Sequence, residues 1–169
     1  IALALTLLAG PALATGLTIE VEGEANGTIQ IDLLEDVAPK HVAQITALAS
    51  EGKYDGVVFH RVIEGFMAQT GDPTGTGTGG SPYPNLPAEF NKERFVRGAL
   101  GMARSQSPNS ANSQFFIMFE PGYFLNGQYT VIGQVTKGMD VVDTIKLGKG
   151  SNGAVIGQPD AMMKVSVID

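Results

Sequence analysis

Apolar and polar residues alternate in two short segments of the chain. Residues 17–22 read LTIEVE and residues 28–33 read TIQIDL, a period of two that is typical of half-buried strands. Asn26 and Gly27 lie between the segments, and this pair favours a tight hairpin turn. The pattern therefore predicts an antiparallel hairpin.

The period changes to that of a helix over residues 37–50. One helical face carries the apolar residues Val42, Ile45, Leu48 and Ala49. We expect Asp36 to cap the start of this helix, Pro39 to lie in its first turn and Gly52 to end it. A second, short helix is expected over residues 139–145.

Short strands account for most of the remaining pattern. β-branched and aromatic residues predict a strand over residues 57–63. Further strands are expected at residues 97–103, 114–119, 130–135 and 155–169, the last broken by a turn at 157–160. Residues 71–87 contain five glycines and four prolines and form the longest irregular stretch. Many short strands with few helices favour a barrel or a sandwich.

Residues 1–14, IALALTLLAGPALA, do not alternate and carry no charge. They end in Ala-Leu-Ala, a pattern typical of a signal-peptidase cleavage site, and they are shorter than the roughly 20 apolar residues of a membrane span. The alternative is an apolar strand or helix of the fold. We expect residues 1–14 to be the remnant of a signal peptide and residues 15–169 to be the folded domain of an exported protein.

Composition excludes several kinds of chemistry. The 169 residues include no cysteine, which excludes disulfides, a thiol nucleophile and cysteine-based metal centres. Two histidines make a metal site unexpected, and a net charge of −6 argues against nucleic-acid binding. The segment GTGTGG at 75–80 formally matches a dinucleotide-binding pattern. Prolines on both sides of it prevent the strand and helix that such a site requires, so a flexible loop is expected.

Two segments combine large apolar side chains with a few polar ones. Residues 59–72 read FHRVIEGFMAQTGD and residues 113–117 read SQFFI. In extended chain Arg61 shares a face with Phe59 and Ile63, and Gln114 shares a face with Phe116. This mixture is typical of a small-molecule or peptide site. It is equally compatible with aromatic residues in the core and Arg61 at the surface.

The two segments resemble signatures of the cyclophilin family of peptidyl-prolyl cis–trans isomerases. FHRVIEGFMAQTGD is similar to the family pattern FHR-x-x-x-x-FM-x-Q-x-GD, and SQFFI is similar to its second signature. The resemblance spans residues 17–169. It implies a mostly β fold, a closed antiparallel barrel of eight strands capped by two helices. It also implies isomerisation of X-Pro bonds in folding proteins without a cofactor or metal.

The resemblance also implies roles for individual residues. Arg61 is the expected catalytic residue, donating a hydrogen bond to the prolyl nitrogen. The expected substrate-binding residues are Phe66, Met67, Gln69, Gly77, Ala103, Arg104, Gln114, Phe116, Phe124, Leu125 and Tyr129. Arg104 enters this set through its backbone, which is expected to hold the substrate peptide in a strand-like manner.

Three positions depart from the best-known eukaryotic members of the family. Phe124 stands where they have a tryptophan and Tyr129 where they have a histidine. A phenyl ring has no N–H to donate, so weak cyclosporin binding is expected. The loop at 105–112 is one residue longer, as in bacterial members, so the resemblance to exported bacterial forms is closer and a location in the bacterial periplasm is expected. A monomer is expected because no coiled coil or obvious apolar patch in the sequence demands a dimer. The expected partners are proline-containing polypeptides, with neither nucleic acid nor, after cleavage of the leader, membrane.

Two other functions are compatible with parts of the pattern. A proline-peptide binding module or holdase would use the same groove without turnover, although such a module would not require Arg61. A small β-barrel carrier of ligands would require a continuous apolar interior.

Overall fold

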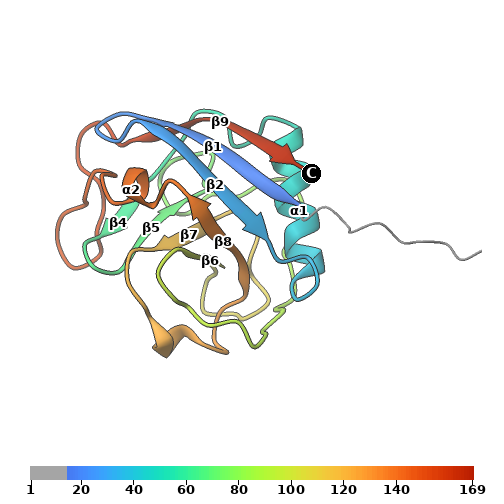
Figure 1. The fold of residues 1–169 in the computed structure, drawn as a ribbon. Helices are drawn as coiled ribbons and strands as arrows, with labels where there is room; N and C mark the ends of the chain where they lie inside the picture. The colour runs from blue at the N-terminus through green and yellow to red at the C-terminus, as the bar shows by residue number, and fades with distance from the viewer. Residues whose placement is uncertain (1–14) are drawn as a thin grey trace, which may run out of the picture.

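Nine strands form one antiparallel sheet in the computed structural model, which describes residues 15–169 (Figure 1). The strands are β1 (Gly16–Glu22), β2 (Gly27–Leu33), β3 (Val57–Val58), β4 (Arg61–Ile63), β5 (Met67–Thr70), β6 (Ala99–Met102), β7 (Phe115–Met118), β8 (Val131–Lys137) and β9 (Ala161–Ile168). The helices are α1 (Pro39–Ser50) and α2 (Met139–Val142), and a 3-10 turn, η1, covers Tyr123–Leu125. The signal peptide predicted for residues 1–14 lies outside the described residues.

The sheet curls into a half-barrel but does not close. Its strand order is β3-β9-β1-β2-β8-β6-β7-β5-β4, so β3 and β4 are the two edges. The mostly β class with two helices is confirmed, whereas the closed eight-stranded barrel is wrong. The strand predicted over residues 57–63 divides at Phe59 and His60; β3 then pairs with β9, and β4 pairs with β5. Because β3 and β4 follow one another end to end in one segment, no ladder of hydrogen bonds joins them.

The first hairpin forms as the alternation predicts. β1 and β2 pair antiparallel, with Leu17 opposite Ile31 and Ile19 opposite Ile29. All four side chains are fully buried and belong to the main core. A side-chain-filled interior is not the continuous cavity that a ligand carrier requires.

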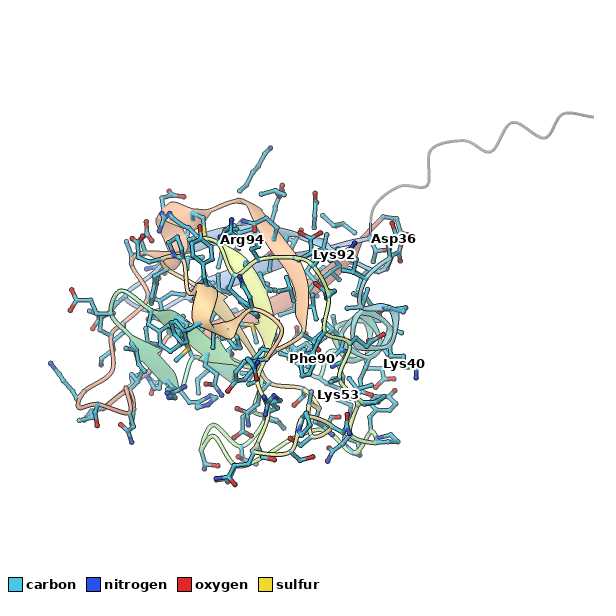
Figure 2. The ribbon with its side chains drawn as sticks, turned by 90° about the horizontal axis from the view of Figure 1, so that it is seen from below. Asp36, Lys40, Lys53, Phe90, Lys92 and Arg94 are labelled. Carbon is cyan, nitrogen blue, oxygen red and sulfur yellow. The ribbon has the colours of Figure 1, made fainter. Side chains whose placement is uncertain are left out.

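Helix α1 begins at Pro39 and not at the residue that the sequence pattern favours. Asp36 is exposed (Figure 2), and the N-cap residue, Ala38, makes no side-chain cap. The carboxylate of Glu89 accepts hydrogen bonds from the backbone N–H groups of Lys40 (3.2 Å) and His41 (2.8 Å) instead. A remote carboxylate therefore satisfies the free N–H groups of the first turn, and the predicted Asp36 cap is wrong.

The ends of the helices agree better with the pattern. Gly52, with φ of +71°, follows α1 in the left-handed region that favours glycine, as predicted. α2 is shorter than the predicted 139–145. Figure 1 shows the two helices on opposite sides of the curled sheet. Within residues 15–169, no helix has both the length and the apolar character needed to cross a membrane.

Candidate active-site groove

The predicted site residues come together in one groove. A hollow of about 440 Å³ is lined by eleven of the twelve, namely Arg61, Phe66, Met67, Gln69, Gly77, Ala103, Arg104, Phe116, Phe124, Leu125 and Tyr129. Gln114 lines an adjoining hollow of about 540 Å³. Four further residues line the first hollow: His60, Thr76, Asn152 and Ala154.

The floor of the groove is a second apolar cluster, separate from the main core. Alternation along β7 divides the two, since Phe116 faces this cluster while Phe115 and Ile117 belong to the main core. Phe116 is 5% exposed and its ring stacks on that of Phe95, with centroids 5.7 Å apart. The floor therefore presents a fixed aromatic surface.

The rim of the groove is more exposed than its floor. Phe124 on η1 has 72% of its surface accessible, and its ring centroid lies 5.6 Å from that of Phe66. Leu125, the next residue, is 7% exposed and packs into the floor. One short turn thus supplies both a floor residue and a rim residue.

Arg61 lies on the edge strand β4 and is held by two hydrogen bonds. Its Nε donates to the backbone oxygen of Asn152 (2.7 Å) and its Nη1 donates to Oε1 of Gln69 (3.1 Å). Three of the five guanidinium N–H groups remain unused among the described residues. None of the ion pairs within residues 15–169 includes Arg61. The guanidinium is therefore oriented and still able to donate.

The neighbours of Arg61 on its strand differ from the prediction. Arg61 and Ile63 are half-buried on one face of β4, with Val62 fully buried between them. Phe59 does not share this face; it lies in the main core, because the extended chain is interrupted before β4.

A chain of side-chain amides extends from Arg61 along the groove. Nε2 of Gln69 donates to Oε1 of Gln114 (2.9 Å), and Nε2 of Gln114 donates to the backbone oxygens of Gly77 (3.1 Å) and Gly79 (2.9 Å). Each amide donates away from Arg61, so each presents its oxygen toward the arginine side. This chain limits rotation of Gln69 and thereby the position of the guanidinium.

The carboxylate of Asp72 holds the loop that borders the groove. It accepts hydrogen bonds from the backbone N–H groups of Thr74, Gly77 and Gly79 and from the hydroxyls of Thr74 and Thr76. Burial alone raises the pKa of Asp72, but the bonds from Thr74, Gly79 and Gly77 lower it to about 2. Because a Cβ on Gly79 would lie 2.2 Å from Oδ1 of Asp72, this position requires glycine. The loop that was expected to be flexible is thus bound to a buried carboxylate.

Arg104 and Tyr129 also line the groove, and their side chains are in contact. The Arg104 guanidinium carbon lies 4.5 Å from the Tyr129 ring centroid, and this ring meets that of Phe116 edge-on at 6.0 Å. Backbone oxygens of Gln128, Ser105 and Gln106 accept hydrogen bonds from the guanidinium. This side of the groove therefore carries a second arginine in a fixed position.

The sequence pattern did not identify His60 or Asn152 as lining residues. His60 falls in the break between β3 and β4, where alternation gives no orientation. Burial lowers the pKa of its imidazole, so the ring is neutral at pH 7. Asn152 reaches Arg61 through a backbone oxygen, and its side chain therefore carries no sequence signal for this contact.

Comparison with known proteins assigns the fold and the sequence to one family. Residues 17–167 match the family model described as "Cyclophilin type peptidyl-prolyl cis-trans isomerase/CLD". A "Probable peptidyl-prolyl cis-trans isomerase" of Brucella suis is 58% identical over 153 residues, covering 84% of this chain and 78% of the relative. "Peptidyl-prolyl cis-trans isomerase B" of Bacillus subtilis is 44% identical over 126 residues, covering 74% and 87%.

Solved structures give the same result. A cyclophilin-type isomerase of Cryptosporidium parvum superposes with a TM-score of 0.82 at 28% identity, covering 93% of this chain and 99% of the other. A structure of that protein in the presence of the dipeptide Ala-Pro has a TM-score of 0.80 at 30% identity, covering 91% and 99%.

Proposed function

The chain belongs to the cyclophilin-type peptidyl-prolyl cis–trans isomerase family and is an isomerase, and we propose that its reaction takes place in the groove around Arg61. One observation carries this proposal. Arg61 is fixed by Asn152 and Gln69 beside an apolar floor, with N–H groups left to donate. That combination suits a reaction needing one oriented donor and no bond to the protein.

The physical demand on the site comes from the amide bond itself. The C–N bond resists rotation with a barrier of about 18–20 kcal/mol, because the nitrogen lone pair is shared with the carbonyl. In the twisted transition state the lone pair returns to nitrogen. A hydrogen bond from Arg61 to that nitrogen is then stronger than in the planar state, and this difference lowers the barrier.

The apolar floor supplies the binding energy for proline. Met67, Phe116 and Leu125 are all less than a tenth exposed and present a shallow apolar surface beside Arg61. A proline ring seated there is held while the preceding carbonyl rotates. Phe66 and Phe124 cover the ring from the rim, and Gln69, Gln114 and the Arg104 backbone bind the peptide chain.

Proline-containing polypeptides are the substrates and binding partners in this proposal. The Cryptosporidium relative that was solved in the presence of Ala-Pro supports this ligand class. The proposal also includes a monomeric state and export to the bacterial periplasm, and the Ala-Leu-Ala ending of residues 1–14 supports the export. N-terminal sequencing of protein from a periplasmic fraction should then begin at Thr15; a sequence that still contains residues 1–14 would contradict export with cleavage.

Replacement of Arg61 tests the mechanism. Arg61→Ala should lower kcat/KM for an X-Pro peptide by at least about 100-fold, because one donor to the transition state is lost. Arg61→Lys keeps the charge but lacks the planar arrangement of donors, so its kcat/KM should lie between those of the wild type and Arg61→Ala. The rate is measured by exchange NMR on a peptide with a populated cis isomer.

Binding measured on the same samples separates isomerisation from simple capture. Titration should show that Arg61→Ala still binds the peptide within a few-fold of the wild type. Near-wild-type turnover by Arg61→Ala would refute the assigned role of Arg61. A wild-type protein that bound the peptide without turnover would instead be a binding module.

A further inference from the structure

Positive charge gathers in the groove of a protein that is otherwise acidic. The chain has a net charge of −6, yet the residues lining the two adjoining hollows include Arg61 and Arg104 and no aspartate or glutamate. Asp72 lies near the groove, but it is fully buried and turned toward the N–H groups of its own loop. The positive charge of the groove therefore favours an anionic ligand.

Arg104 lies where the two hollows meet. The residues shared by both hollows are Gln69, Gly77, Ala103 and Arg104. Arg61 lines only the first hollow. A peptide with its proline beside Arg61 that continued from the first hollow into the second would pass Arg104, which lines both.

The guanidinium of Arg104 is preorganised without being neutralised. Carbonyl oxygens of Gln128, Ser105 and Gln106 accept four of its five N–H groups, leaving one on Nη2. The Tyr129 ring fixes its plane from one side. No carboxylate within residues 15–169 forms an ion pair with it. Because the guanidinium is already held in place, little side-chain entropy is lost when a ligand binds it. Its charge remains available to that ligand.

We infer that the Arg104 side chain selects peptides that carry a carboxylate within two residues of the proline. This inference rests on the proposed function, because it assigns the proline to the hollow at Arg61. It gives Arg104 a specificity role that is distinct from the peptide contact of its backbone.

A matched peptide series tests the inference. Peptides carry Glu, Gln or Lys at one of the two positions before or after proline, and kcat/KM is measured by exchange NMR. On one flank we expect kcat/KM for the Glu peptide to exceed that for the Gln peptide by about two- to fivefold, the effect typical of a half-exposed charge pair. The value for the Lys peptide should fall below that for the Gln peptide. The Glu/Gln ratio should approach one in 1 M salt, where charge interactions are screened within about 3 Å.

Variants assign the selectivity to one side chain. Arg104→Gln should bring the Glu/Gln ratio to about one, whereas Arg104→Lys should keep it above one. Arg94→Gln is the matched control, since Arg94 is exposed and also stacks on a tyrosine, Tyr123, at 4.0 Å, but does not line either hollow. This control should keep the wild-type ratio.

The outcomes separate this inference from the proposed function. Turnover with a Glu/Gln ratio of one on both flanks, or a ratio unchanged in Arg104→Gln, overturns the selectivity and leaves the isomerase mechanism intact. Absence of turnover with every peptide overturns the proposed mechanism. In that case the Kd ratios of the Glu and Gln peptides, from NMR titration of wild type and Arg104→Gln, decide the selectivity by themselves.

Discussion

The Asp72 loop and the Arg61 groove share Gly77 but use charge in opposite ways. Gly77 donates its N–H to the Asp72 carboxylate, and its carbonyl accepts from Gln114 on the groove side. Asp72 is fully buried and accepts five hydrogen bonds, so nothing of its charge is left for a ligand. Arg61 makes two hydrogen bonds and keeps three donors. A carboxylate whose acceptor sites are all used suits a role in stabilising the fold, whereas the unused donors of Arg61 are what the proposed mechanism requires.

Removing the charge of Asp72 gives the largest expected change in stability. Asp72→Asn should reduce the free energy of unfolding by about 2–3 kcal/mol at pH 7, because the pKa of Asp72 lies near 2 instead of near 4. Urea unfolding followed by circular dichroism measures this loss. Asp36→Asn is the matched control, since Asp36 is exposed and caps nothing, and it should change stability by less than about 0.5 kcal/mol.

The pH dependence gives an independent check on Asp72. A lowered carboxyl pKa stabilises the fold fully above the unfolded-state pKa near 4, and the stabilisation disappears as pH falls toward 2. The stability difference between wild type and Asp72→Asn should therefore shrink between about pH 4 and pH 2. A difference that stayed constant over this interval would contradict the saturated-carboxylate interpretation.

The Glu89 cap of α1 is a second carboxylate held by several hydrogen bonds, and it predicts a smaller effect. Burial raises the pKa of Glu89, and hydrogen bonds from the His41 ring and from the backbone N–H groups of His41 and Lys40 lower it below its usual value. Glu89→Gln keeps one acceptor oxygen and should cost about 1 kcal/mol at pH 7, a typical value for a lost cap. Urea unfolding against Glu93→Gln, an exposed neighbour, provides the comparison. An equal, small change in both variants would show that the cap contributes nothing.

A substitution at the exposed rim of the groove gives the smallest expected effect, a change in cyclosporin affinity. Phe124→Trp adds one N–H donor at a side chain that is 72% exposed, and cyclosporin should then bind at least about threefold more tightly. Isothermal titration of wild type, Phe124→Trp and Tyr123→Trp measures the effect, the last variant placing the same ring one residue away. If the wild type bound cyclosporin tightly and Phe124→Trp did not improve the affinity, both the expected weak binding and the role of the missing donor would be wrong.

Local pattern predicted most elements and failed where strands had to find partners. The first hairpin and the apolar face of α1 follow from periodicity, since each is decided by residues within a few positions. β5, which pairs with both β4 and β7, was not predicted as a strand, and the predicted strand over residues 57–63 is two strands. Strand pairing depends on distant segments, so alternation in one segment cannot count strands or close a sheet.

The candidate site shows the same division between local and distant information. The resemblance to the family identified the residues that line the groove, six of them within the two signature segments, because residue types and spacing are written in the sequence. Their arrangement depends on contacts across many residues: Arg61 with Asn152, Gln69 with Gln114, and Arg104 with Gln128. The contacts of Arg61 and Arg104 end on backbone oxygens, which leave no pattern in the sequence, and the sequence does not show that the amides of Gln69 and Gln114 meet.

By itself, the sequence determined the mostly β class, the helix of residues 37–50 and the residue types of the groove, because periodicity and signature spacing are local properties. The tertiary structure alone decided that the sheet stays open between β3 and β4 and that Glu89 caps α1. It also decided how many donors Arg61 and Arg104 retain, since hydrogen bonds are used up by whichever groups the fold brings within reach.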